Sequence, residues 1–204
     1  MPRPRVNLLS VELIADAAIE LADSGEPFGV NALARRLGVT PSSLYNHVDG
    51  KDAIIELMRG RLSRRYLPAV ATGEWDAVVI GTVRALRRLY AEHPLIVPLI
   101  VGKTITDPDV IAGYDRLATA LVEAGVADDE VLAIVAIVDA YAIGFGMDLA
   151  SPDEIWRPDV PTVTLGRLIA GAAAGSERSD AAFEIGLDML VASLRMRIAG
   201  PRAR

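Results

Sequence analysis

The stretch VNALARRLGVTPSSLYNHVDGK, residues 30–51, decides the fold of the N-terminal part of this 204-residue chain. Its first half places apolar residues at the spacing of one helical face and ends at Gly38, the residue type that most readily takes a left-handed conformation. Thr40 can then cap a second helix, and Pro41 suits its first position because no amide partner is lost there. The pattern predicts two short helices joined by a tight turn.

The second of these helices has two contrasting faces. Leu44 and Val48 can anchor it in a core. The other face carries short or planar hydrogen-bonding side chains, which can approach base edges and phosphates without burying a charge. These side chains are Ser42, Ser43, Tyr45, Asn46 and His47. A helix packed wholly inside a core would not carry them, so the stretch predicts a helix-turn-helix that binds DNA.

The motif resembles that of the TetR family of transcriptional regulators, in which a recognition helix ending in Leu-Tyr-x-His is followed by a lysine. The matching residues here are Leu44, Tyr45, His47 and Lys51. The resemblance extends upstream to an amphipathic helix expected over residues 10–24 and, more loosely, downstream to the C-terminus. It implies an all-α fold with a three-helix DNA-binding domain over residues 1–51. A helical domain for effector binding and dimerisation is then expected over residues 52–204.

The family's functional roles carry over to the motif residue by residue. The resemblance places one set of side chains against bases, namely Asn31, Pro41, Ser42, Ser43 and Asn46. It places a second set against phosphates, namely Thr40, Tyr45, His47 and Lys51. Asn31 and Asn46 can each read adenine through paired hydrogen bonds, but serines discriminate poorly, so the operator sequence does not follow. Two alternatives stay open, because Tyr45 can pack against the next helix and His47 can cap the end of its own.

The net charge of −6 at first argues against a nucleic-acid partner, but its distribution reverses that impression. Residues 1–67 carry nine Lys and Arg against eight Asp and Glu, whereas the remainder carries twelve against nineteen. The acidic excess therefore lies away from the motif. The basic side chains expected where DNA would approach are Arg3, Arg5, Arg35, Arg36 and Lys51.

Composition also narrows the compartment and the chemistry. The chain has no cysteine, which excludes a disulfide framework and fits a reducing cytoplasm. No signal peptide is visible at the N-terminus. An enzyme would need convergent acid, base or nucleophilic groups, yet the chain has two histidines and no nucleotide-binding loop. No catalytic residue, metal or cofactor is therefore expected, and a lone His93 outside the motif argues against metal-dependent tetracycline sensing.

Helical periodicity continues through the rest of the chain, and alternating β patterns are scarce. Residues 151–163 are rich in proline and acid and are expected to form a loop. Asp128 is expected to cap the helix that begins near Val131. The expected helices are residues 52–67, which would link the two domains, and residues 74–92, 95–101, 107–124, 131–149, 164–174 and 180–198.

Two of these helices, residues 131–149 and 180–198, are too apolar to be covered by one chain. The first is interrupted by Asp139 and two glycines, which argues against a membrane span. In the TetR family such helices pack against their copies as a four-helix bundle across a two-fold axis, so the resemblance implies a homodimer. The alternative is an ordinary buried helix pair within one subunit.

The resemblance implies that the C-terminal domain holds a pocket for a small-molecule effector. The residues themselves add only a short set of candidates for its lining. Aromatic or polar residues on otherwise apolar helices are the candidates, although most such residues simply pack in a core. They are His93, Tyr114, Asp139, Tyr141, Phe145 and Trp156. Asp139 needs a partner, which can be a ligand cation or hydroxyl, or an arginine across the dimer. An apolar pocket predicts a hydrophobic effector.

The resulting hypothesis is a repressor that binds a palindromic DNA operator and leaves it when the effector binds. Effector and operator would prefer different conformers, with Gly50 and Pro68 as hinges of the linking helix. The alternative is a constitutive repressor or architectural DNA-binding protein that responds to no ligand.

Overall fold

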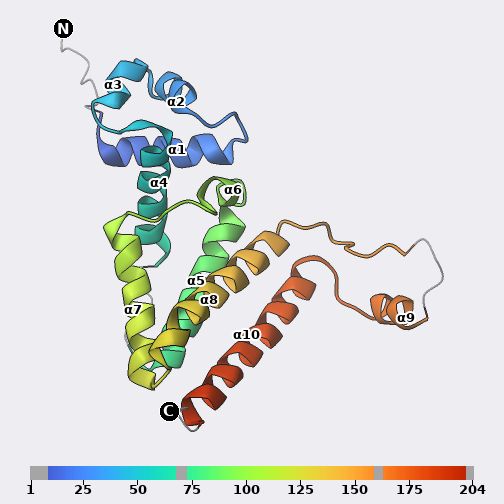
Figure 1. The fold of residues 1–204 in the computed structure, drawn as a ribbon. Helices are drawn as coiled ribbons and strands as arrows, with labels where there is room; N and C mark the ends of the chain where they lie inside the picture. The colour runs from blue at the N-terminus through green and yellow to red at the C-terminus, as the bar shows by residue number, and fades with distance from the viewer. Residues whose placement is uncertain (1–8, 68–72, 159–162, 201–204) are drawn as a thin grey trace. The chain divides into compact units, whose positions relative to one another are not determined.

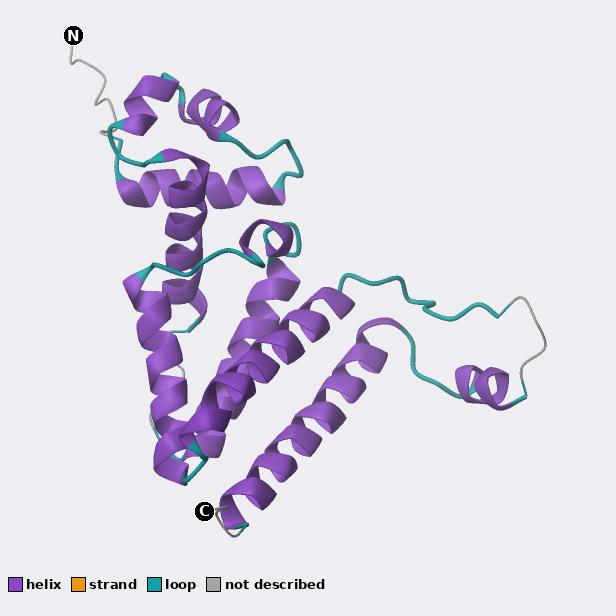
Figure 2. Cartoon of the chain, in the orientation of Figure 1, coloured by secondary structure: helices purple, strands orange, loops and turns teal. Residues whose placement is uncertain are grey.

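The computed structural model describes residues 9–67, 73–158 and 163–200, and every regular element within them is an α-helix (Figures 1 and 2). The expected all-α fold is confirmed. The chain forms two compact units. The first consists of Met1–Pro68 with Leu95–Gly113, and the second of Ala69–Pro94 with Tyr114–Arg204. The first unit thus takes in more of the chain than the DNA-binding domain expected over residues 1–51.

The first unit is built around two packed helices, α1 and α4, with α2 and α3 completing the motif. Its helices are α1 (Val11–Asp23), α2 (Val30–Leu37), α3 (Pro41–Tyr45), α4 (Gly50–Tyr66) and α6 (Val97–Ile100). Ser10 caps α1, because its side chain accepts a hydrogen bond of 3.2 Å from the amide of Leu13. Ile14 and Ala18 of α1 and Met58 of α4 are fully buried. This core holds the motif on a rigid base.

The second unit contains the longest helices, of which α5 and α8 pack against each other most extensively. Its helices are α5 (Trp75–Glu92), most of α7 (Pro108–Ala124), α8 (Asp128–Asp148), α9 (Thr164–Ala170) and α10 (Gly175–Ala199). Gly146 allows the close approach, because a Cβ there would lie 2.5 Å from the Cβ of Tyr90. Phe183 of α10 and Val138 of α8 are buried in the shared core.

The helix boundaries depart from expectation around α8, α9 and α10. Asp128 does not cap α8 but is its first residue, and Ala127 occupies the N-cap. Helix α9 ends at Ala170, where Gly171 follows, and not at residue 174. Helix α10 begins at Gly175, five residues earlier than expected, because Ala174 is extended and its polar first turn continues into the apolar repeat.

Two apolar stripes remain exposed on α8 and α10. The stripe of α8 consists of Leu132, Ala133, Ala136, Ile137, Ala140, Gly144 and Met147. The stripe of α10 consists of Ala181, Ile185, Met189, Ala192 and Met196. Members recur every three or four residues, so each stripe lies along one side of its helix. Helix α8 alone among the described helices is long and apolar enough to cross a membrane. Only about a third of its most apolar stretch is buried.

Candidate nucleic-acid interface

The turn between α2 and α3 has the geometry that its sequence predicted. Gly38 follows the last residue of α2 and adopts the left-handed conformation, with φ 67° and ψ 28°. Its amide donates to the carbonyl of Arg35 at 3.2 Å, and the amide of Val39 donates to the carbonyl of Ala34 at 3.0 Å. These bonds satisfy carbonyls at the end of α2 and turn the chain sharply toward α3.

Helix α3 begins with the predicted cap and proline. The Thr40 side chain accepts a hydrogen bond of 3.2 Å from the amide of Ser43, and Pro41 is the first helical residue. Leu44 is fully buried and Val48 nearly so, so they anchor α3 and the segment after it. A helix of only five residues is held in place by these contacts more than by its own hydrogen bonds.

Nearly all the residues expected to contact DNA are exposed. Those on the surface are Asn31, Thr40, Pro41, Ser42, Tyr45, Asn46, His47 and Lys51. Tyr45 is 57% exposed, so its ring is not packed into the core. Asn46, not His47, is the residue at the C-cap of α3. Ser43 is half-buried, and its hydroxyl lies 3.0 Å from the Thr40 hydroxyl, so capping engages both.

The basic side chains near the motif have different surroundings. Arg36 pairs with Glu20 at 3.2 Å and with Glu26 at 3.8 Å, which ties α2 to α1. Lys51 has its ammonium 5.6 Å from the centre of the Phe28 ring, a contact that the sequence did not indicate. Arg35 is exposed. Arg3 and Arg5, also expected near DNA, lie outside the described residues.

Two of the six candidate effector residues are joined directly in the second unit. The hydroxyl of Tyr114 on α7 donates a hydrogen bond of 2.6 Å to Asp139 Oδ2 on α8. Asp139 is half-buried, with Val138 and Ala142 beside it fully buried. This bond supplies the partner that a carboxylate on such a helix needs.

Tyr141 and Phe145 form a second group, together with Phe183 of α10. The three ring centres lie 4.8 to 5.6 Å apart. The Tyr141 hydroxyl donates to the backbone carbonyl of Phe183, and Gly186 leaves room for its ring. Burial, assisted by the nearby Glu184, raises the pKa of Tyr141, which keeps its hydroxyl a donor. This group therefore fastens α8 to α10 as well as being a candidate ligand contact.

The remaining two candidates are His93 and Trp156. His93 is buried at the C-cap of α5, where its amide donates to the carbonyl of Leu89 at 3.0 Å. Trp156 is half exposed, in the loop after α8. Among the described residues no cluster of three or more histidines and carboxylates is arranged to hold a metal ion.

An ionic cluster that the sequence did not predict joins α5, α8 and α10. Arg178 donates two hydrogen bonds, of 3.1 and 3.0 Å, to the carboxylate of Asp148. Arg87 donates to Asp180 at 2.7 Å and lies 4.2 Å from the centre of the Phe183 ring. Burial alone would raise the pKa of Asp148, but hydrogen bonds from Ser179 and Arg178 outweigh it, so the pKa is lowered.

The chain is similar to a known protein family and to known transcriptional regulators. The family described as "Tetracyclin repressor-like, C-terminal domain" matches residues 67–198. The HTH-type transcriptional repressor DrrR1 of Streptomyces coeruleorubidus is 26% identical over 78% of this chain. An HTH-type transcriptional regulator of Saccharopolyspora erythraea is 31% identical over 74% of it. The chain spans 64% and 63% of the lengths of these two relatives.

Solved structures share the fold at low sequence identity. Apo ActR from Streptomyces coelicolor is 20% identical, with a TM-score of 0.74 over 94% of this chain and 99% of its own. ActR in complex with actinorhodin gives the same TM-score over 94% of this chain and 97% of its own, also at 20% identity. A TetR variant from Acinetobacter baumannii in complex with minocycline is 19% identical, with a TM-score of 0.71 over 94% and 99%.

Proposed function

The chain belongs to the TetR family of transcriptional regulators, and from that premise we propose that it is a homodimeric repressor. It binds a palindromic operator in double-stranded DNA and leaves it when a small hydrophobic effector binds. The protein acts in the cytoplasm and is not an enzyme. Its two regulator relatives support the DNA-binding part of this proposal.

The observation that carries DNA binding is the exposed polar face of a capped and anchored α3. Leu44 fixes this helix from below, while Tyr45, Asn46 and Ser42 point away from the core. Asn46 suits base edges, and Tyr45 with Lys51 suits phosphates, which carry most of the affinity. The same side chains would serve no purpose in packing.

The apolar stripes of α8 and α10 support a homodimer. A second copy related by a two-fold axis would cover both stripes at once in a four-helix bundle, and the small alanines allow close helix approach. Two copies of α3 could then enter successive major grooves about 34 Å apart, which requires a palindromic site. The second copy would also cover much of the apolar stretch of α8, of which only about a third is buried within one chain.

The second unit supports effector binding less directly. The Tyr114–Asp139 pair offers a hydrogen-bonding group among apolar helices, as small-molecule sites commonly do. Structures that share this fold hold actinorhodin in ActR and minocycline in a TetR variant. His93, Tyr141, Phe145 and Trp156 remain candidates for the same pocket. Gly50, left-handed at φ 79°, remains a candidate hinge, whereas Pro68 lies outside the described residues.

One experiment tests the DNA-binding proposal. The full chain selects duplexes from a random-sequence library, and the enriched sequences are footprinted. We expect an inverted repeat with half-sites about one helical turn apart, bound by two protomers. Enrichment of no sequence, or binding of one protomer to a single half-site, contradicts the proposal.

A second experiment separates an effector-controlled repressor from a constitutive one. Fluorescence anisotropy of the selected duplex is measured against a panel of hydrophobic compounds that includes minocycline. Release of the duplex by at least one compound supports effector control, provided that native mass spectrometry also shows that compound bound to the protein. Uniform retention of the duplex across the panel supports the ligand-independent alternative.

A further inference from the structure

One segment of the chain joins the first unit although both neighbouring stretches belong to the second. Leu95–Gly113 is grouped with the DNA-binding helices, whereas Ala69–Pro94 and Tyr114–Arg204 form the other unit. Helix α7 begins at Pro108 in this segment and continues without a break into the second unit. Whatever fixes the segment to α4 therefore fixes one end of a helix whose other end lies in the second unit.

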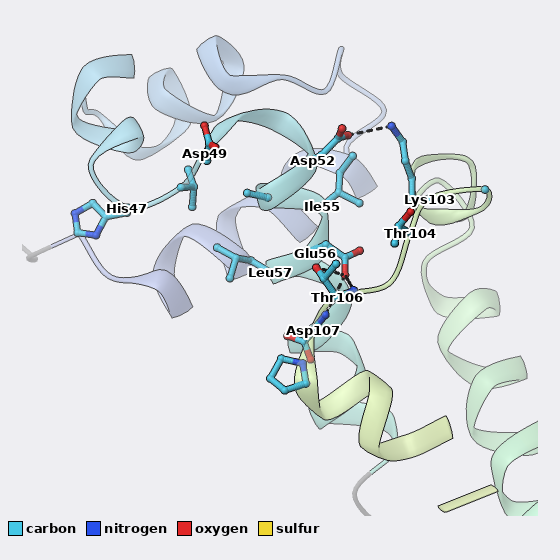
Figure 3. A pocket seen from close by; sticks show the side chains of 14 residues that line it. His47, Asp49, Asp52, Ile55, Glu56, Leu57, Lys103, Thr104, Thr106 and Asp107 are labelled. Carbon is cyan, nitrogen blue, oxygen red and sulfur yellow. Dashed lines mark hydrogen bonds and ion pairs between the residues drawn. The ribbon is translucent and has the colours of Figure 1, made fainter. Parts of the chain in front are cut away.

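Glu56 of α4 holds the end of the segment that leads into α7 (Figure 3). Its Oε2 accepts hydrogen bonds from the amides of Thr106 at 2.7 Å and Asp107 at 3.2 Å. It also accepts one from the Thr106 hydroxyl at 3.3 Å. The Glu56 side chain is only 16% exposed, so water competes little with these charge-assisted bonds.

Arg59, one helical turn along α4, holds the other end. Its Nε lies 3.0 Å from Glu56 Oε1, and its Nη2 donates a hydrogen bond of 3.0 Å to the carbonyl of Ile100. Its side chain is 11% exposed. Glu56 and Arg59 therefore form one paired group, here called the bridge, that binds the backbone at residue 100 and at residues 106–107.

Asp107, next to this bridge, is closely packed between α7 and α4. Asp107 caps α7, because its Oδ1 accepts from the amides of Asp109 at 3.0 Å and Val110 at 3.2 Å. The same carboxylate lies against Gly60 of α4, where there is no space for a Cβ. A groove of about 630 Å³ lies between α4 and the segment, and Glu56, Thr106 and Asp107 belong to its lining (Figure 3).

The other ion pairs between α4 and this segment, all within the first unit, are weaker. Lys103 pairs with Asp52 at 3.0 Å, but the two side chains are 46% and 76% exposed. Arg64 pairs with Asp109 at 2.6 Å, with exposures of 45% and 53%. Exposed ion pairs of this kind contribute little, so Glu56 and Arg59 are the main polar attachment of the segment to α4.

We infer that Glu56 and Arg59 are positioning residues that couple the DNA-binding helices to the second unit, although they belong to neither the DNA-contacting nor the candidate effector residues. The inference rests on the proposed function and specifies its regulation. Binding free energies of two sites are coupled reciprocally, so DNA bound at α3 must alter the second unit if an effector there releases DNA. The coupling can therefore be measured with DNA alone.

The test uses hydrogen exchange of the full chain, with and without the selected duplex. In the wild type we expect the duplex to change exchange in peptides from α5 and α8. In Glu56→Ala we expect the Thr106 and Asp107 amides to exchange about tenfold faster, because each loses a bond to a carboxylate. The remote change should disappear while duplex affinity stays within about threefold, since no phosphate contact is removed.

Three further variants sharpen the result. Glu56→Gln keeps an acceptor oxygen and should restore part of the remote response, which a merely destabilised protein would not do. Arg59→Lys keeps the charge but loses the planar donor that reaches Ile100, and should weaken the response. Lys103→Ala removes an exposed pair of the same segment and should leave the response at the wild-type level.

The outcomes separate the two proposals. A remote response that survives in both Glu56→Ala and Arg59→Lys overturns the inference, as does a wild type that binds the duplex with no remote response. Failure of the wild type to select any duplex overturns the proposed function instead. Equal loss of the response in Lys103→Ala would also contradict the inference, because the weak pair would then matter as much as the bridge.

Discussion

Tyr114 donates its hydroxyl hydrogen bond to Asp139 over 2.6 Å, and this bond joins α7 to α8 across 25 residues of sequence. A carboxyl group at a half-buried position needs such a donor, because a polar group removed from water without a hydrogen bond costs free energy. The pair is therefore a structural link between the two helices.

Removing this donor should destabilise the second unit. We expect Tyr114→Phe to lower the free energy of unfolding by about 1 to 3 kcal/mol, because Asp139 Oδ2 loses its hydrogen-bond donor in a half-buried place. Urea unfolding followed by circular dichroism measures the change. Tyr45→Phe is the matched control and should shift stability by less than about 0.5 kcal/mol, since the ring is exposed. Equal stabilities for the two variants would remove the structural role of the bond.

Lys51→Ala should weaken binding to all duplexes alike. Loss of one phosphate contact should lower the slope of log affinity against log salt by about one unit. Anisotropy titrations of the selected duplex at several salt concentrations measure that slope. Arg167→Ala removes an equal charge from an exposed position on α9 of the second unit and should leave the slope unchanged. An unaltered slope in Lys51→Ala would exclude its phosphate role.

Met189→Lys should break the homodimer. The change places a charge in the α10 stripe, where a second copy would bury it without a partner. Analytical ultracentrifugation should show monomers, and affinity for the palindromic duplex should fall by at least about tenfold. Val122→Lys is the control, because Val122 is an exposed apolar residue of α7 outside both stripes. A dimeric Met189→Lys protein would place the interface elsewhere.

Asp148 should contribute its full stability above the ordinary carboxyl pKa of 3.8 and lose that contribution progressively as the pH falls below it. Its pKa is lowered in the folded protein, so the unfolded chain takes up the proton first as the pH falls, and the contribution is lost on acidification. We expect Asp148→Asn to cost about 1 to 3 kcal/mol at pH 7. The difference from wild type should shrink below about pH 4 in thermal melts across a pH series. A difference that does not vary with pH would mean that the Arg178 pair is not its source.

The sequence predicted those parts of the fold that local chemistry controls. Gly38, Thr40 and Pro41 each perform the expected turn or cap, because the partners lie within a few residues. Helix α1 was expected over residues 10–24 and covers Val11–Asp23. Capping and one-face periodicity depend little on the rest of the chain, so such signals are legible without a structure.

Long-range pairing was not predictable in the same way. The sequence predicts that α10 begins at residue 180, after Arg178 and Ser179, yet Arg178 binds Asp148 on another helix and Ser179 is fully buried. The partner of Asp139 likewise depends on the register between α7 and α8. Glu56 and Thr106 lie 50 residues apart, and nothing in either stretch marks the other. The DNA-contact and effector assignments stay predictions.

The exposed stripes of α8 and α10 make the stability of the protein depend on its concentration if a second copy covers them. If only a second copy covers them, folding and association are one equilibrium, and dilution alone lowers thermal stability. Operator occupancy would then rise with roughly the square of copy number at low abundance, since only pairs read a palindrome. A modest change in synthesis or turnover of the chain would switch its genes more sharply than a monomer could.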